Sequence, residues 1–125
     1  MTEEKNVLLY RVAQKSFEEA TSSSLGATFH IIIAFHLKQK FGKDPYEVLI
    51  SNPKLFYSGL KEVLGEGAEA VLNLAGTYIA AKYKLPFSVE EFTRIFTKDD
   101  ATATQKLSQI FRTIIDQEEQ KLKGR

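Results

Sequence analysis

Two histidines, His30 and His36, are the first residues to consider for chemistry. They lie six residues apart in a segment expected to be helical, so they point about 120° apart around the helix axis. A metal site on one helix needs ligands three or four residues apart, and the pair therefore cannot hold a metal together. We expect both rings to be half-buried and hydrogen-bonded to backbone or carboxylate neighbours. His36 shares a helical stripe with Phe29 and Ile32, so we predict that it is the more deeply buried, pH-sensitive histidine.

Pairs of neighbouring carboxylates recur along the chain, each at an expected helix start or on an expected polar face. General acid–base catalysis needs two carboxyl groups that converge across a cleft with separated pKa values, whereas adjacent helical residues diverge by about 100°. Glu62, Glu66 and Glu69 bracket a glycine turn and form a better cation-site candidate, although a solvated acidic surface is the simpler interpretation. We therefore predict a protein that is not an enzyme, with no catalytic residues, no cofactor and no metal.

A glycine turn, Gly65-Glu66-Gly67, joins two of the expected helices. It lacks the preceding strand and the third glycine of a dinucleotide-binding loop, and the Lys-Ser/Thr ending of a phosphate-binding loop. The arrangement is comparable to a helix-turn-helix, whose second helix reads bases through Arg, Lys, Asn or Gln near its start. Here that helix begins Ala68-Glu69-Ala70-Val71, which would repel phosphates. We interpret the turn as a corner between two packed helices.

A modest basic patch is the remaining candidate for nucleic-acid binding. Asp44 and Glu47 interrupt it. Its members are Lys38, Lys40, Lys43, Lys54 and Lys61.

The last expected helix has a wide apolar face followed by a polar end. This face either closes the core or pairs with a second copy of the chain, and we predict it as a partner interface. The candidate interface residues are Leu107, Ile110, Phe111, Ile114 and Leu122.

Length and composition indicate a single-domain protein without disulfides or a membrane-spanning segment. The chain has 125 residues, 43% of them hydrophobic and 26% charged, with no cysteine and a net charge of +1. This length predicts a single domain over residues 1–125, and the missing cysteines exclude disulfides and thiolate chemistry. The most apolar run, residues 29–37, is too short to cross a membrane, and the polar first residues do not form a secretory signal. We expect a cytoplasmic protein with no membrane partner.

Hydrophobic periodicity predicts an all-α fold. A β-strand over residues 29–35 is rejected, because no other segment shows strand alternation to pair with it. Residues 24–41 are apolar on several faces, so we expect a compact, irregular bundle of six or seven helices around this central hydrophobic helix. Ser88 and Glu91 predict a capping box, with Phe87 and Phe92 as its hydrophobic staple. The other expected helices cover approximately residues 2–20, 46–50, 54–64, 68–84, 88–97 and 100–122.

Local signals predict where several of these helices begin and end. The serine cluster at residues 21–24 is expected to end the first helix, although the first two helices could also continue with a bend. Asp44-Pro45 and Asn52-Pro53 are two cap-then-proline pairs that predict helix starts, and Asp99 or Asp100 is expected to cap the last helix. Gly76 costs about 1 kcal/mol in a helix interior, so we expect another helix to pack closely against it.

Several of these segments together resemble a known family. Ser24-Leu25-Gly26, Phe35-His36-Leu37, Lys40-Phe41-Gly42, Asn52-Pro53 with Phe56, and Leu64-Gly65-Glu66-Gly67-Ala68 are similar to the small archaeal domain called the Nitrosopumilus output domain. The resemblance covers approximately residues 18–84, and leaves residues 86–125 as a C-terminal helical extension. It implies a compact archaeal helical module of unknown function that is often attached to regulatory or sensory parts, without established activity.

These observations favour a small interaction or regulatory module that acts through protein contacts, as a homodimer or with another protein. The alternative is a nucleic-acid-binding regulator that uses the lysine patch. A third hypothesis is a small apolar ligand in a pocket beside the central helix, lined by Phe29, Phe35 or His36.

Overall fold

The computed structural model describes residues 2–98 and 101–123, and this part of the chain is all-helical. The all-α prediction is therefore confirmed. The seven helices in these ranges are α1 (Thr2–Leu25), α2 (Ala27–Phe41), α3 (Pro45–Ser51), α4 (Pro53–Leu64), α5 (Gly67–Tyr83), α6 (Val89–Thr97) and α7 (Ala103–Lys123).

Local signals in the sequence account for most helix ends. The Asp44 carboxylate accepts a hydrogen bond from the Tyr46 backbone N–H and the Asn52 side chain accepts one from Leu55, so both cap-then-proline pairs start helices. The capping box of Ser88 and Glu91 is present in full. The predicted caps Asp99 and Asp100 of the last helix lie outside the described residues.

The boundary between α1 and α2 lies later than predicted. The serine cluster was expected to end the first helix, but α1 continues to Leu25. The Thr21 hydroxyl donates to the Phe17 carbonyl one turn earlier, which lets the residue fit within a helix. The chain turns instead at Gly26, whose φ of 96° lies in the region that glycine adopts most easily.

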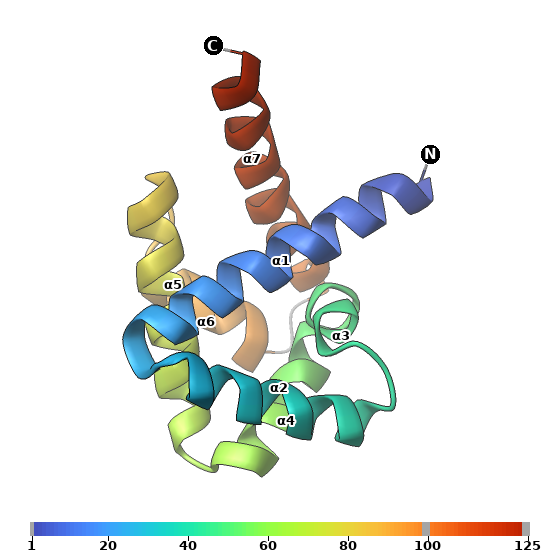
Figure 1. The fold of residues 1–125 in the computed structure, drawn as a ribbon, viewed down its shortest axis with the longest axis vertical. Helices are drawn as coiled ribbons and strands as arrows, with labels where there is room; N and C mark the ends of the chain where they lie inside the picture. Colours follow the sequence, from blue (N-terminus) through green and yellow to red (C-terminus); the bar gives the residue numbers. More distant parts are fainter. Residues whose placement is uncertain (1, 99–100, 124–125) are drawn as a thin grey trace.

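Helices α1 and α5 each pack against several other helices, and α5 runs along one side of the bundle (Figure 1). Helix α1 crosses the molecule and contacts α2, α3, α5 and α7, while α5 packs against α1, α4 and α6. The core between them is rich in aromatic rings: the Phe56 ring lies 5.6 Å from that of Phe17 and 6.1 Å from that of Phe96, measured between centroids. These contacts join α1, α4 and α6 at one point.

Helix α2 is not the central helix that its composition predicts. One side, with His30, Ile33 and Leu37, is buried against α1, α3 and α4. On the other side Ile31 is 64% exposed and Ile32 is 51% exposed. The prediction was wrong because an all-round apolar sequence indicates burial only if other helices cover both faces. Here no described helix covers the outer face.

Close helix packing is confirmed at Gly76. A Cβ atom added there would lie 2.8 Å from Cδ2 of Phe92, and ordinary contacts are longer than this. Glycine thus lets α5 and α6 approach each other, and the Phe92 ring, stacked on Phe87 at 5.6 Å, fills the space.

The predicted interface on the last helix is mostly core. Leu107, Phe111 and Ile114 are fully buried, so they are not available to a partner, and for these three the prediction was wrong. Ile110 is half-buried, and Leu122 is 79% exposed. The apolar face closes the core because α1, α3 and α6 pack against it.

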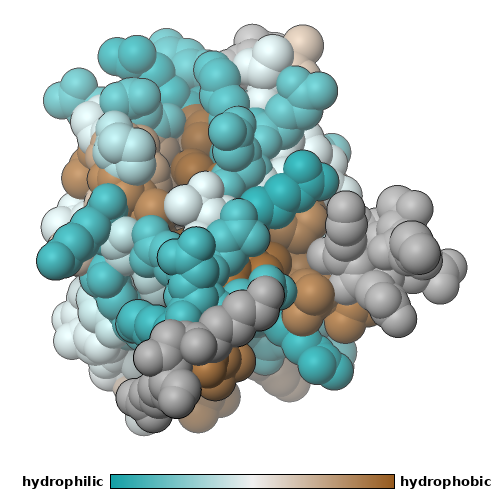
Figure 2. Space-filling view, turned by 90° about the horizontal axis from the view of Figure 1, so that it is seen from above, coloured by the Kyte–Doolittle hydropathy of each residue, from teal (hydrophilic) through white to brown (hydrophobic). Residues whose placement is uncertain are grey.

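The end of α7 extends beyond the rest of the bundle (Figure 1). It is tied to α5 where the Gln117 side chain donates to the Tyr83 carbonyl at 2.9 Å. Seen from this end, the surface is mostly hydrophilic, with hydrophobic areas in separate places (Figure 2). No helix in the described ranges is long and apolar enough to span a bilayer.

Candidate functional site

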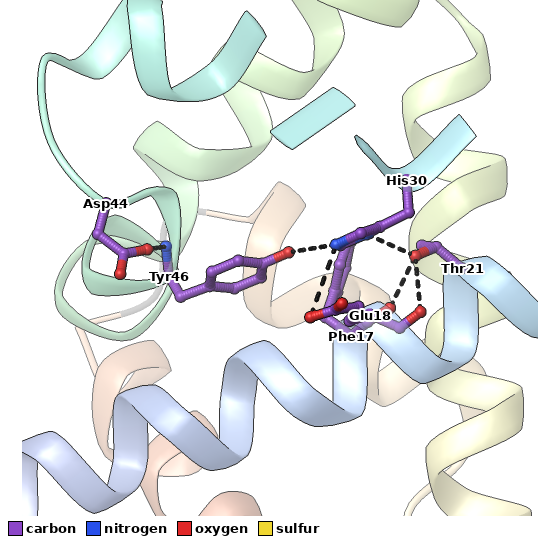
Figure 3. A network of polar contacts seen from close by, with 6 residues as sticks. All are labelled: Phe17, Glu18, Thr21, His30, Asp44 and Tyr46. Atoms are coloured by element: carbon purple, nitrogen blue, oxygen red, sulfur yellow. Dashed lines mark hydrogen bonds and ion pairs between the residues drawn. The ribbon is translucent and has the colours of Figure 1, made fainter. Parts of the chain in front are cut away.

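A buried chain of polar side chains joins the first three helices (Figure 3). Thr21 comes from α1, His30 from α2 and Tyr46 from α3, and each is less than a tenth exposed. Thr21 Oγ1 lies 2.9 Å from His30 Nδ1, and the Tyr46 hydroxyl lies 3.3 Å from His30 Nε2. We call these three residues the His30 network.

The hydrogen atoms of the His30 network can be assigned from its geometry. The Thr21 hydroxyl donates to the Phe17 carbonyl at 2.9 Å, so its oxygen is left to accept a hydrogen bond from His30 Nδ1–H. With its proton on Nδ1, the neutral ring has a lone pair on Nε2, which accepts from the Tyr46 hydroxyl. Every polar atom of the ring is therefore satisfied when His30 is neutral.

Burial keeps both titratable groups of the network neutral. Loss of solvation lowers the pKa of His30, and the negative charge of Glu18 opposes this shift only in part. Burial also raises the pKa of Tyr46, with the carboxylates of Glu18 and Asp44 adding to the rise. Glu18 Oε2 lies 3.9 Å from His30 Nε2. A proton on Nε2 would thus gain an ion pair with Glu18 and lose the hydrogen bond from Tyr46.

The His30 network connects three helices. A nucleophile or general base must reach its substrate, whereas both ring nitrogens of His30 already have partners inside the protein. Each partner lies on a different helix, so His30 attaches the inner side of α2 to α1 and α3.

Acid is expected to destabilise the fold through His30. The folded-state pKa of His30 is lowered, so the unfolded chain binds the proton first as the pH falls below about 6.5. The free energy of unfolding should therefore decrease between about pH 7 and about pH 5, and His30→Gln should remove much of this dependence. Chemical denaturation across this pH range measures both slopes. The control, His36→Gln, should keep the wild-type slope, and equal slopes for wild type and His30→Gln would contradict the assignment.

The prediction that His36 is the buried histidine was wrong. His36 is exposed, with its ring 5.7 Å from that of Phe35, and His30 is buried instead. The signal that could have found this is the spacing of His30, Ile33 and Leu37, which share one helical stripe. The stripe that contains His36 includes Ile32, which faces outward.

All five lysines of the predicted nucleic-acid patch are exposed. Lys40 forms an ion pair with Glu62, which reduces the positive charge of the patch. Glu62 is also a member of the candidate cation site, so one carboxylate of that site is paired with a lysine. Nucleic-acid binding stays a prediction.

The other predicted sites are not assembled in the part of the chain that the structure describes. No three or more His, Asp or Glu side chains there come together as a possible metal site. A depression of about 280 Å³ between α1, α2 and α3 is lined by Phe35 and Tyr46, but not by Phe29 or His36. The expected apolar pocket therefore lacks two of its three predicted lining residues.

Comparison of the chain with known proteins found no matching family model, no matching curated protein and no matching solved structure. The resemblance to the Nitrosopumilus output domain stays a prediction.

Proposed function

We propose that this protein is a non-catalytic interaction module, and that a second copy of the chain docks on the outer face of α2. The observation that carries the proposal is a group of exposed apolar side chains on a surface helix. Ile31 and Ile32 are joined there by Phe35, which is 56% exposed. These three residues form what we call the α2 outer face. They lie within about one helical turn of one another, so they make one apolar surface.

A second copy suits this surface because of how charge is distributed along α2. The helix has no acidic residue, and its lysines, Lys38 and Lys40, are in the last turn. In an antiparallel pair related by a two-fold axis near Ile32, these lysines would lie beside the uncharged first turn of the partner helix. Ile32 would then face its own copy across the axis, and Phe35 would lie beside the first turn of the partner helix.

The size of the α2 outer face predicts a weak dimer. Burying what remains exposed of each side chain is worth about 1 kcal/mol, or about 6 kcal/mol for the pair of helices. The loss of translational and rotational freedom opposes this gain. A gain of about 6 kcal/mol corresponds by itself to a Kd of about 40 µM, so after this loss we expect self-association only at hundreds of micromolar or above. The buried His30 network fixes the angle at which α2 presents this surface.

Sedimentation velocity over a range of concentrations tests the proposal. Wild type should shift from monomer to dimer as its concentration rises to hundreds of micromolar, and Ile32→Asp should remain a monomer with an unchanged circular dichroism spectrum. Leu122→Asp, the same change at an exposed site on α7, should dimerise like wild type. A wild-type monomer throughout this range, or equal dimerisation by Ile32→Asp, would overturn the proposal.

A further inference from the structure

A groove of about 660 Å³ lies between α6 and α7, on different helices from the α2 outer face. The α6 side runs from Glu91 to Lys98, and the α7 side runs from Lys106 to Thr113. On each side, most lining residues are three or four positions apart in the sequence. They therefore lie on one face of a helix, and this face points toward the groove. The volume lies within the range of small-molecule sites.

The groove has an apolar floor. Phe87 and Phe92 stack on each other and line it together with Ile95 and Ile110. Ile110 is the member of the predicted α7 interface that faces this groove. An alkyl chain on this floor would cover Phe87 and Ile110, which are partly exposed to water in the free protein, whereas Phe92 and Ile95 are already buried.

Positive charge gathers at one end of the groove. Arg94 lies on α6 and Lys98 is the first residue after that helix, and neither forms an ion pair with another described residue. Lys106 of α7 lies on the other side, close to the short connection between the two helices. The aspartates that follow Lys98 in the sequence lie outside the described residues.

The lining carboxylate lies at the opposite end. Glu91 lies three residues before Arg94 and seven before Lys98, and its side chain accepts a hydrogen bond from the Ser88 backbone N–H as part of the capping box. The Glu91 side chain is thus held toward the helix start, on the side away from Lys98.

We propose that this groove binds an amphipathic carboxylate. Its head would lie between Arg94 and Lys98, where a guanidinium and an ammonium group can both donate to it. Its alkyl tail would extend along Ile95 and Ile110 toward Phe87. An uncharged apolar ligand would leave the cationic end unused, and a cationic amphiphile would be repelled there, so charge selects the ligand class.

Titration with three probes of equal chain length tests this site: decanoate, decanol and decylamine, each below the concentration at which it forms micelles. Amide chemical shifts should change mainly at residues that line the groove, and decanoate should bind at least about tenfold more tightly than decylamine. Binding of decylamine as tight as that of decanoate, or shifts centred elsewhere, would overturn the proposal.

Charge reversal separates the head site from the tail site. The double variant Arg94→Glu, Lys98→Glu should lose about tenfold or more in affinity for decanoate and keep the wild-type affinity for decanol. The control, Lys43→Glu with Lys121→Glu, makes the same charge change at exposed lysines outside the groove and should bind decanoate almost as wild type does. Equal loss in both double variants would show that only net charge matters and would overturn the proposed site.

Discussion

Phe111→Asp is expected to unfold the protein. The Phe111 ring is 1% exposed, on the face of α7 that packs into the bundle. Removing a buried phenylalanine side chain costs about 3–5 kcal/mol, and an unpaired carboxylate in its place adds a desolvation cost. The sum is comparable to the whole stability of a domain of this size, about 5–15 kcal/mol. Thermal denaturation followed by circular dichroism should show a lost or strongly lowered transition.

Leu122→Asp is the matched control for this substitution. It makes a similar change on the same helix, but at a side chain that already faces water, so the melting temperature should stay close to that of wild type. A cooperative, wild-type-like transition for Phe111→Asp would mean that the apolar face of α7 is surface rather than core.

Gly76→Leu is expected to destabilise the fold by about 3 kcal/mol or more, measured by urea unfolding. Even the first added carbon would lie 2.8 Å from Cδ2, 3.1 Å from Cγ and 3.3 Å from Cβ of Phe92. These atoms include the base of the ring, which cannot move unless α6 moves too. The small gain in helix propensity, about 1 kcal/mol, does not offset this clash.

Gly67→Leu provides the comparison within the same helix. The nearest atom to a Cβ at Gly67 is 3.9 Å away, an ordinary contact, and the residue is exposed. This variant should be as stable as wild type or slightly more stable, since leucine favours a helix over glycine. If both variants lost the same free energy, the effect would come from replacing a helical glycine and not from contact between α5 and α6.

Features that depend on nearby residues were predicted well. The capping box at Ser88, the starts of α3 and α4 at proline, and the close approach at Gly76 agree with the structure. Each follows from hydrogen bonds or steric limits within a few residues, or from a helical glycine that needs a compensating contact.

The His30 network could not be predicted from neighbouring residues in the sequence. Both histidines lie on one strongly apolar helix, and each shares a stripe with isoleucine or leucine. The choice between them depends on Thr21 and Tyr46, which α1 and α3 bring to His30 from nine and sixteen residues away. No pattern within α2 contains that information.

The sequence by itself determined that the chain is helical, approximately where its helices begin and end, and which residues are apolar enough for a core. The tertiary structure decided which apolar faces are covered: the face of α7 with Phe111 became core, and the face of α2 with Ile32 stayed exposed. The physical reason is that helix formation follows local periodicity and capping, whereas burial requires a second surface that only packing between distant segments supplies. For this protein, that difference places the proposed contact surface on α2 and not on α7.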